Sequence, residues 1–324
     1  MHNVLRFYRH NVKQIWVTII FGILLFALLQ WLNQMARDEK NRNNILSNQN
    51  SSSISNSSTT TVPEKEKNVV VSGIGLSDEE AKKNKNIINT FVGYCNDKDI
   101  EKAYDLLTVE CKEKMFPTIQ DFYNNYCAKV FKEAKVCDMQ TWVSTSSWYT
   151  YKVALMGDIL ASGKVEQSNV FTDYYTIVRT KEGEMKLNIN SYVGREKLEK
   201  GEAGGNLTIK IISKDVYMDY EVYNLELKNN TDKIIMIDSK RKTDTVFVSD
   251  ENNLKYQAYM YEIDDSLLKI EGNMERKISI KFNKIYNPNR KLTFMSFTDI
   301  ILDYERYREN PAEYTRIENR MIDL

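Results

Sequence analysis

The residues from Ile15 to Leu32 (IWVTIIFGILLFALLQWL) form an uncharged, almost wholly apolar run in an otherwise hydrophilic chain. At about 1.5 Å per helical residue, this run extends roughly 27 Å, close to the thickness of a bilayer's hydrocarbon core. A cleaved secretory signal has a shorter apolar region and then small residues, whereas bulky residues follow this run. The run therefore predicts an uncleaved transmembrane signal anchor.

The flanks of the run predict its orientation. The stub 1–14 carries three basic residues and no acid, whereas the far flank mixes both signs, which favours a cytoplasmic N-terminus. Residues 33–76 contain a long tract of Asn, Ser and Thr without apolar periodicity, which predicts a disordered tether. The predicted localisation is the plasma membrane, single-pass, with the bulk of the chain extracytoplasmic.

The composition excludes several classes of function. The chain has 45 basic and 45 acidic residues, and the three basic residues of the stub leave 42 against 45 beyond it, so no nucleic-acid partner is expected. Both histidines, His2 and His10, lie in the stub, so the remainder lacks the commonest general base and zinc ligand. There is also no Gly-rich phosphate loop. We predict a protein that is not an enzyme, with no catalytic, cofactor-binding or metal-binding residues.

Four cysteines are the candidate disulfide residues: Cys95, Cys111, Cys127 and Cys137. An even number in an exported domain allows two disulfides in three pairings, and reduced, partly buried thiols are the alternative. Because no CxxC pair occurs, a zinc cluster is not expected. The pattern leaves disulfides and free thiols equally open.

Residues 77–199 predict a first folded unit of α+β class. Ser77, Asp99 and Thr118 are candidate N-caps of three helices, and the apolar spacing after Ser77 is helical. Alternating segments between residues 136 and 192 then predict strands. Helices followed by a strand meander indicate three helices packed on a curved antiparallel sheet, a cone.

The residues of this unit resemble a known family. The stretch FVGYCNDKDIEKAYDLLTVECKEKMFPTIQDFYNNY (Phe91–Tyr126) and the closing stretch DYYTIVRTKEGEMKLNINSYV (Asp173–Val193) resemble nuclear transport factor 2-like domains. The resemblance implies the same cone fold. Members include isomerases and dehydratases with a polar pocket as well as many non-catalytic modules, so it implies no single function.

A linker at 200–205 and a second unit at 206–304 are predicted next. Apolar residues alternate in Tyr223–Leu227 and in Ile278–Phe282, and turn residues separate about seven such segments, which predicts an antiparallel β-sandwich. YEVYNLELKNNTDKIIMI (Tyr220–Ile237) and KISIKFNKIYNPNRKLTFMSFTDIIL (Lys277–Leu302) resemble immunoglobulin-like domains of bacterial surface proteins. The resemblance implies a binding or spacer module.

The tail 305–324 predicts a C-terminal helix that begins at Asn310 and Pro311. Its apolar stripe would pack on this chain or on a partner, including a second copy; the stripe consists of Tyr314, Ile317, Met321 and Leu324.

These features together predict a non-catalytic, membrane-anchored envelope protein whose extracytoplasmic modules bind a protein or cell-wall partner. The order of stub, helix and cone also resembles bitopic assembly subunits of conjugation or type IV secretion machines, which is the first alternative. The second alternative is a small-molecule enzyme that uses a buried cone carboxylate of raised pKa beside a Tyr donor.

Overall fold

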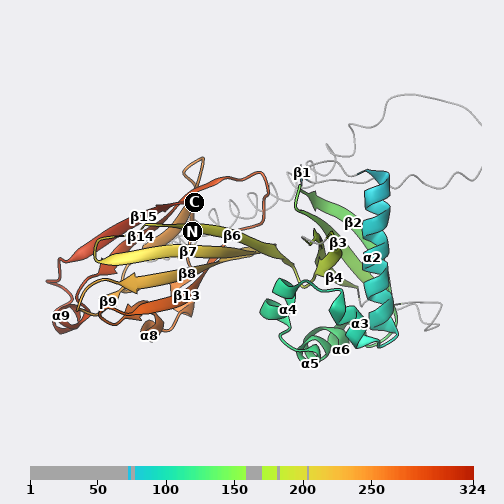
Figure 1. Ribbon diagram of the computed structural model, residues 1–324, viewed down its shortest axis with the longest axis horizontal. Coiled ribbons are helices and arrows are strands. Elements are labelled where there is room, and N and C mark those ends of the chain that lie inside the picture. Colours follow the sequence, from blue (N-terminus) through green and yellow to red (C-terminus); the bar gives the residue numbers. More distant parts are fainter. Residues whose placement is uncertain (1–71, 74–76, 158–169, 181–182, 203) are drawn as a thin grey trace, which may run out of the picture. The chain divides into compact units, whose positions relative to one another are not determined.

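After a two-residue strand, helices come first in the described chain, and strands make up most of the remainder (Figure 1). The computed structural model describes residues 72–73, 77–157, 170–180, 183–202 and 204–324, which belong to one compact unit. The strands form three sheets of five, six and four strands.

The first helix, α2 (Asp78–Asn96), begins where the sequence predicts. The Ser77 side chain accepts a hydrogen bond from the Glu80 amide, and acids occupy the first turn, which suits the positive end of the helix dipole. The face that carries Ile88, Phe91 and Cys95 is buried against the five-stranded sheet.

The structure contradicts the predicted transmembrane architecture. Within the described ranges, no helix is long and apolar enough to cross a membrane. The longest helix there, α2, has 19 residues but carries three acids and several lysines. The run Ile15–Leu32, the stub 1–14 and all of the tether 33–76 except 72–73 lie outside the described residues. The predicted single-pass, signal-anchored protein and the plasma-membrane localisation inferred from it are corrected accordingly.

The prediction of three helices in the first unit is also wrong, because the second region divides into two helices. The third region, 119–130, is helical throughout but contains a π-helical turn. The second divides at Leu107, which bridges Leu187, and the Thr108 amide donates to the Leu187 carbonyl at 2.9 Å. Pairing with the sheet therefore takes backbone groups that a continuous helix would use. The segments after α2 are α3 (Ile100–Asp105), α4 (Val109–Met115), α5 (Ile119–Phe122), the π-helical turn η1 (Tyr123–Cys127) and α6 (Ala128–Val130).

The five-stranded sheet has the order β1-β2-β3-β4-β5 and lies beside these helices (Figure 1). In β3, buried Tyr151, Val153 and Leu155 alternate with less buried residues, and these buried side chains share one core with the helices. The two-residue β1 pairs in parallel with the end of β2. The strands are β1 (Ser72–Gly73), β2 (Lys135–Ser144), β3 (Trp148–Gly157), β4 (Phe171–Arg179) and β5 (Met185–Asn188).

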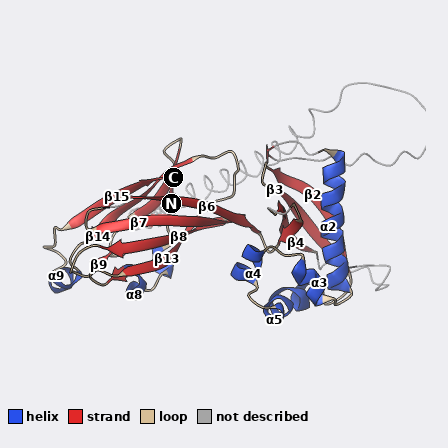
Figure 2. Cartoon of the chain, in the orientation of Figure 1, coloured by secondary structure: helices blue, strands red, loops and turns tan. Residues whose placement is uncertain are grey.

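The other two sheets are antiparallel and share a second core (Figure 2). The four-stranded sheet has the order β13-β8-β7-β6, and its strands are β6 (Tyr192–Glu202), β7 (Leu207–Tyr217), β8 (Tyr220–Asn229) and β13 (Glu275–Asn283). The six-stranded sheet has the order β11-β10-β14-β9-β12 with β15 beside β14. Its strands are β9 (Ile235–Met236), β10 (Val246–Asp250), β11 (Lys255–Gln257), β12 (Lys269–Ile270), β14 (Leu292–Ile301) and β15 (Ile317–Asp323).

Strand β6 extends into the range 200–205, in which the sequence predicts a linker. It begins at Tyr192 and ends at Glu202, and it pairs with β7 along most of its length. Residues 192–199 therefore join the four-stranded sheet rather than the five-stranded one. The division of the chain at 200–205 into two units stays a prediction.

The predicted C-terminal helix is wrong, because its residues form strand β15. Antiparallel pairing with β14 buries Ile322, which lies between the two last members of the predicted stripe. Met321 is instead 61% exposed. The short helices of this part are η2 (Met260–Glu262), α8 (Asp265–Leu268) and α9 (Tyr304–Glu309).

Candidate functional site

A cavity of about 940 Å³ lies where the turn between β2 and β3 meets the ends of β4, β7 and β8. One edge is formed by β6, and the connection between β13 and β14 closes another. The volume lies at the upper end of the range typical of small-ligand pockets. This cavity is the candidate functional site.

The side chains that line the cavity carry an excess of positive charge. Two acids, Glu196 and Glu221, face six basic side chains, which are Arg179, Arg195, Lys197, Lys214, Lys284 and Arg290. Two of the basic groups pair with acids outside the cavity lining: Arg195 with Asp215 and Glu113, and Arg290 with Asp250 at 3.9 Å. The cavity nevertheless retains a positive balance, which favours a negatively charged ligand.

Two buried residues of opposite charge that line the cavity, Glu221 and Lys284, occupy strand positions that point toward the apolar core. Glu221 has the same strand parity as the buried Tyr223–Leu227 positions, and Lys284 continues the inward parity of Ile278–Phe282. Each charged residue lies two positions beyond the last apolar residue of its alternating series, so the same inward-facing positions pass from the core into the cavity. The sequence prediction missed these two residues, although the alternation contains the signal that could have located them.

Glu221 and Lys284 form a buried ion pair. Lys284 Nζ lies 2.6 Å from Glu221 Oε1, and Glu221 Oε2 accepts a hydrogen bond from the Tyr223 hydroxyl at 3.1 Å. Lys214 Nζ lies 2.9 Å from Glu196 Oε2 and 3.8 Å from Glu221 Oε1.

Burial lowers the pKa of Lys284 below its ordinary value, the pairing with Glu221 opposes this shift, and Lys214 adds to it. Glu196, Lys214, Glu221 and Lys284 thus form a network of alternating charges that is largely shielded from water.

One wall of the cavity is an aromatic contact between distant parts of the sequence. The Trp148 indole donates a 2.6 Å hydrogen bond to the Tyr286 hydroxyl, which joins the start of β3 to the segment after β13. Burial raises the pKa of Tyr286 to about 12, so this hydroxyl stays protonated at neutral pH. The Trp148 ring also packs over Gly194, where an added Cβ would lie 3.1 Å from it.

Behind this wall, an ion-pair cluster links helix α4 to β7. The side chain of Asp215 is fully buried and accepts hydrogen bonds from Arg195 at 2.7 Å and Asn224 at 2.8 Å, and Lys114 lies 2.9 Å away. Burial alone would raise the pKa of Asp215, but these partners outweigh it and lower the pKa. The cluster fixes the orientation of β6, on which Arg195 lies.

Another buried carboxylate, Asp173, matches the residue types that the enzyme hypothesis requires. Burial raises the pKa of Asp173, against the hydrogen bonds that lower it, and the Tyr126 hydroxyl donates to it at 3.0 Å. The Asn190 amide shares Oδ2 with Tyr126, while Oδ1 accepts from the Tyr174 amide and the Ser191 hydroxyl. Since four protein donors occupy its oxygens and it is 4% exposed, Asp173 holds β4 to its neighbours.

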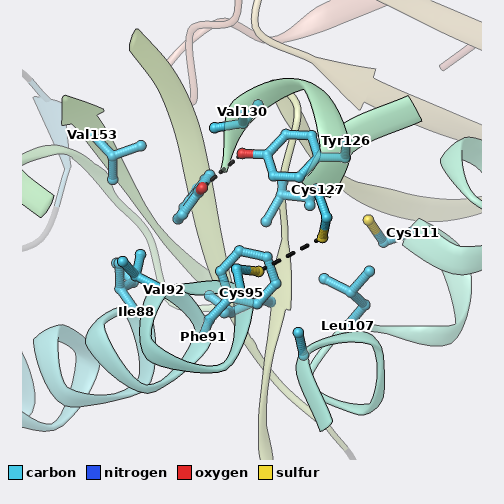
Figure 3. Packing of buried hydrophobic residues seen from close by; sticks show 14 of the residues in the cluster. Ile88, Phe91, Val92, Cys95, Leu107, Cys111, Tyr126, Cys127, Val130 and Val153 are labelled. Carbon is cyan, nitrogen blue, oxygen red and sulfur yellow. Dashed lines mark hydrogen bonds between the residues drawn. The ribbon is translucent and has the colours of Figure 1, made fainter. Parts of the chain in front are cut away.

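The four candidate disulfide cysteines do not form a disulfide in this structure. Cys95 Sγ and Cys127 Sγ lie 3.8 Å apart and point toward each other, and Cys111 lies nearby in the same core (Figure 3). Cys137 is half-buried on β2. All four cysteines are free in this structure, and the choice between disulfides and free thiols stays a prediction.

The predicted stripe is dispersed in the structure. Tyr314 packs edge-to-face on Tyr307 and accepts a hydrogen bond from the Asp303 amide, while Ile317 and Met321 are exposed. Leu324 borders the cavity. The structure does not bring these four residues onto one face.

In the part of the chain that the structure describes, no three His, Cys, Asp or Glu side chains are grouped as a metal site. Comparisons with protein-family models, curated proteins and solved structures find no match. The two resemblances noted in the sequence therefore stay predictions.

Proposed function

We propose that this protein is a non-catalytic binding protein that holds part of a protein partner in the cavity beside β6. The observation that carries the proposal is the cavity itself: it is large, positively charged and bordered by a strand edge and an aromatic contact. Cavities with a few convergent polar groups are the usual position of a binding site.

The character of the polar groups favours binding over catalysis. Lys284 Nζ donates a 2.6 Å hydrogen bond to one carboxylate oxygen of Glu221, and the Tyr223 hydroxyl donates one to the other oxygen. A general base needs an oxygen or nitrogen within reach of a substrate proton. The most strongly buried carboxylate of the first core, Asp173, has both oxygens occupied by protein donors. We therefore propose no catalytic residue.

Photo-crosslinking in cells that express the full chain tests the proposal. A photoreactive phenylalanine at Ser147 and another at Asn287 would sample two walls of the cavity, because both residues are exposed and line it. Both probes should capture the same partner. A probe at the exposed Ser266, which does not line the cavity, should not capture it.

Equal capture from Ser266, or unrelated partners at Ser147 and Asn287, would count against the cavity as the binding site. Turnover of a small molecule that is abolished by Asp173→Asn, in a variant that remains folded, would instead establish the enzyme alternative.

A further inference from the structure

The cavity follows the edge of strand β6. Four consecutive residues, Arg195–Leu198, line it, although successive side chains of a strand point to opposite faces. Arg195–Lys197 pair with β7 in regular register, and a β-bulge follows Lys197. A single face cannot present three successive residues in regular register, so the cavity reaches the backbone edge of the strand. In the sheet order β13-β8-β7-β6, β6 is the last strand, and no other strand among the described residues pairs with it opposite β7.

Strand β15 is bonded to the turn that follows β6, at the far end of the strand from the cavity. Arg320 of β15 donates a hydrogen bond to the Gly204 carbonyl, and Asn206 donates one to Glu318 of β15. Nearer the start of β6, Arg195–Leu198 face the cavity instead of β15. An uncovered strand edge offers a row of amide and carbonyl groups to an extended peptide.

Two exposed cations lie beside this open edge. Arg179, at the end of β4, and Lys197, on β6, both line the cavity, and within the described ranges neither has a carboxylate within ion-pair distance. The neighbouring acids are already occupied, because Glu196 pairs with Lys214 and Glu221 pairs with Lys284. The available charge at the edge is therefore positive.

We infer that the partner segment is an extended acidic peptide that pairs with the open edge of β6 and places carboxylates beside Arg179 and Lys197. This inference rests on the function proposed above and adds the chemistry of the partner. Main-chain hydrogen bonds along β6 supply affinity that does not depend on sequence, and the two cations select acidic side chains. A small anion would use the cations but not the strand edge.

Titration of the full chain with synthetic peptides, followed by calorimetry, tests the inference. The probe is a short peptide in which Glu alternates with Val. One control replaces every Glu by Gln, and a second keeps the Glu residues but methylates alternate backbone nitrogens. The Glu peptide should bind, with an affinity that falls as ionic strength rises. Both controls should bind at least about tenfold more weakly, since each lacks one class of hydrogen bond.

Variants of the chain locate the contact. Arg179→Gln combined with Lys197→Gln should weaken binding of the Glu peptide about tenfold or more, because two charge-assisted contacts are lost. Lys200→Gln is the matched control, since Lys200 is an exposed lysine of β6 that does not line the cavity, and it should leave the affinity unchanged. Amide hydrogen exchange of the full chain should slow at Arg195–Leu198 when the peptide is bound.

Three results would overturn the inference: equal binding of the Gln peptide, equal binding of the methylated peptide, or full competition by inorganic phosphate. Failure of the proposed binding function gives a different set of results from failure of the peptide inference. If cavity probes at Ser147 and Asn287 capture the same partner but the Glu peptide does not bind, the cavity binds a partner of other chemistry. If no partner is captured and no peptide binds, both proposals are wrong.

Discussion

Lys284 Nζ lies 2.6 Å from Glu221 Oε1, and each side chain is 3% exposed. Glu221 lies near the start of β8, and Lys284 directly follows β13. Both are at positions where the apolar alternation of the strand would place a core residue. Removing two charges from water is costly, and mutual attraction offsets the cost only while both partners remain. Substitution of one member of the pair therefore tests whether the pair is shielded from water.

Replacing Glu221 by Gln should destabilise the protein by about 3–5 kcal/mol, because it leaves the Lys284 ammonium buried without a counter-charge. The free energy of unfolding in urea measures the effect. Glu275→Gln is the control, since its pair with Lys228 is about half exposed (52% and 55%). That change should cost less than about 1 kcal/mol. Equal effects would contradict a desolvated pair at Glu221.

The stability that Asp215 contributes should depend on pH. Its folded pKa lies below the ordinary value of 3.8, so its contribution is fully present above pH 3.8 and is lost as the pH falls through the folded pKa. Asp215→Asn lacks this titration and should be destabilised by about 3 kcal/mol at pH 7. The difference in unfolding free energy between the two proteins should shrink as the pH falls below 3.8. A constant difference across this range would contradict the assignment.

Asp173→Asn should also destabilise the protein, although it removes a buried charge. Four donors share the two carboxylate oxygens, and the amide nitrogen of Asn cannot accept the hydrogen bonds of the oxygen that it replaces. Each unsatisfied buried donor costs about 1–3 kcal/mol. Thermal unfolding at pH 7 measures the loss. Asp138→Asn, at an exposed position of β2, should change the midpoint little.

The cysteines should differ in their reaction with a thiol reagent. Cys95 and Cys111 are 0% exposed and Cys127 is 1% exposed, so all three should react only after unfolding. Cys137 is half-buried, and burial raises its pKa to about 12, so its slow reaction in the native protein should accelerate as the pH rises. Absorbance titration counts the thiols. Modification of two or more native thiols, or fewer than four after unfolding without reductant, would contradict the structure.

The C-terminal segment provides a direct comparison between strand and helix. Ile322→Ala should cost about 2–5 kcal/mol, because Ile322 is buried in the second core. Met321→Ala should change the unfolding free energy by less than about 0.5 kcal/mol, because Met321 is exposed. A helical stripe through Tyr314, Ile317, Met321 and Leu324 would give the larger cost at Met321. Urea unfolding of the two variants distinguishes the arrangements.

Local signals in the sequence determined where helices begin and which strand residues face inward. Ser77 and Thr118 cap helices as predicted, because capping depends on side-chain and amide groups a few residues apart. The alternations at Tyr223–Leu227 and Ile278–Phe282 are buried as predicted. Both signals depend on short-range geometry, which the sequence contains directly.

Tertiary contacts decided the features that local patterns could not. Pairing with Leu187 divides the second helix at Leu107, and β14 draws the tail into a strand although its apolar spacing suggests a helix. The pairing of Glu221 with Lys284 joins residues 63 positions apart. Hydrogen bonding between distant strands and the desolvation of opposite charges depend on the whole fold, so the cavity and its charge follow from the tertiary structure.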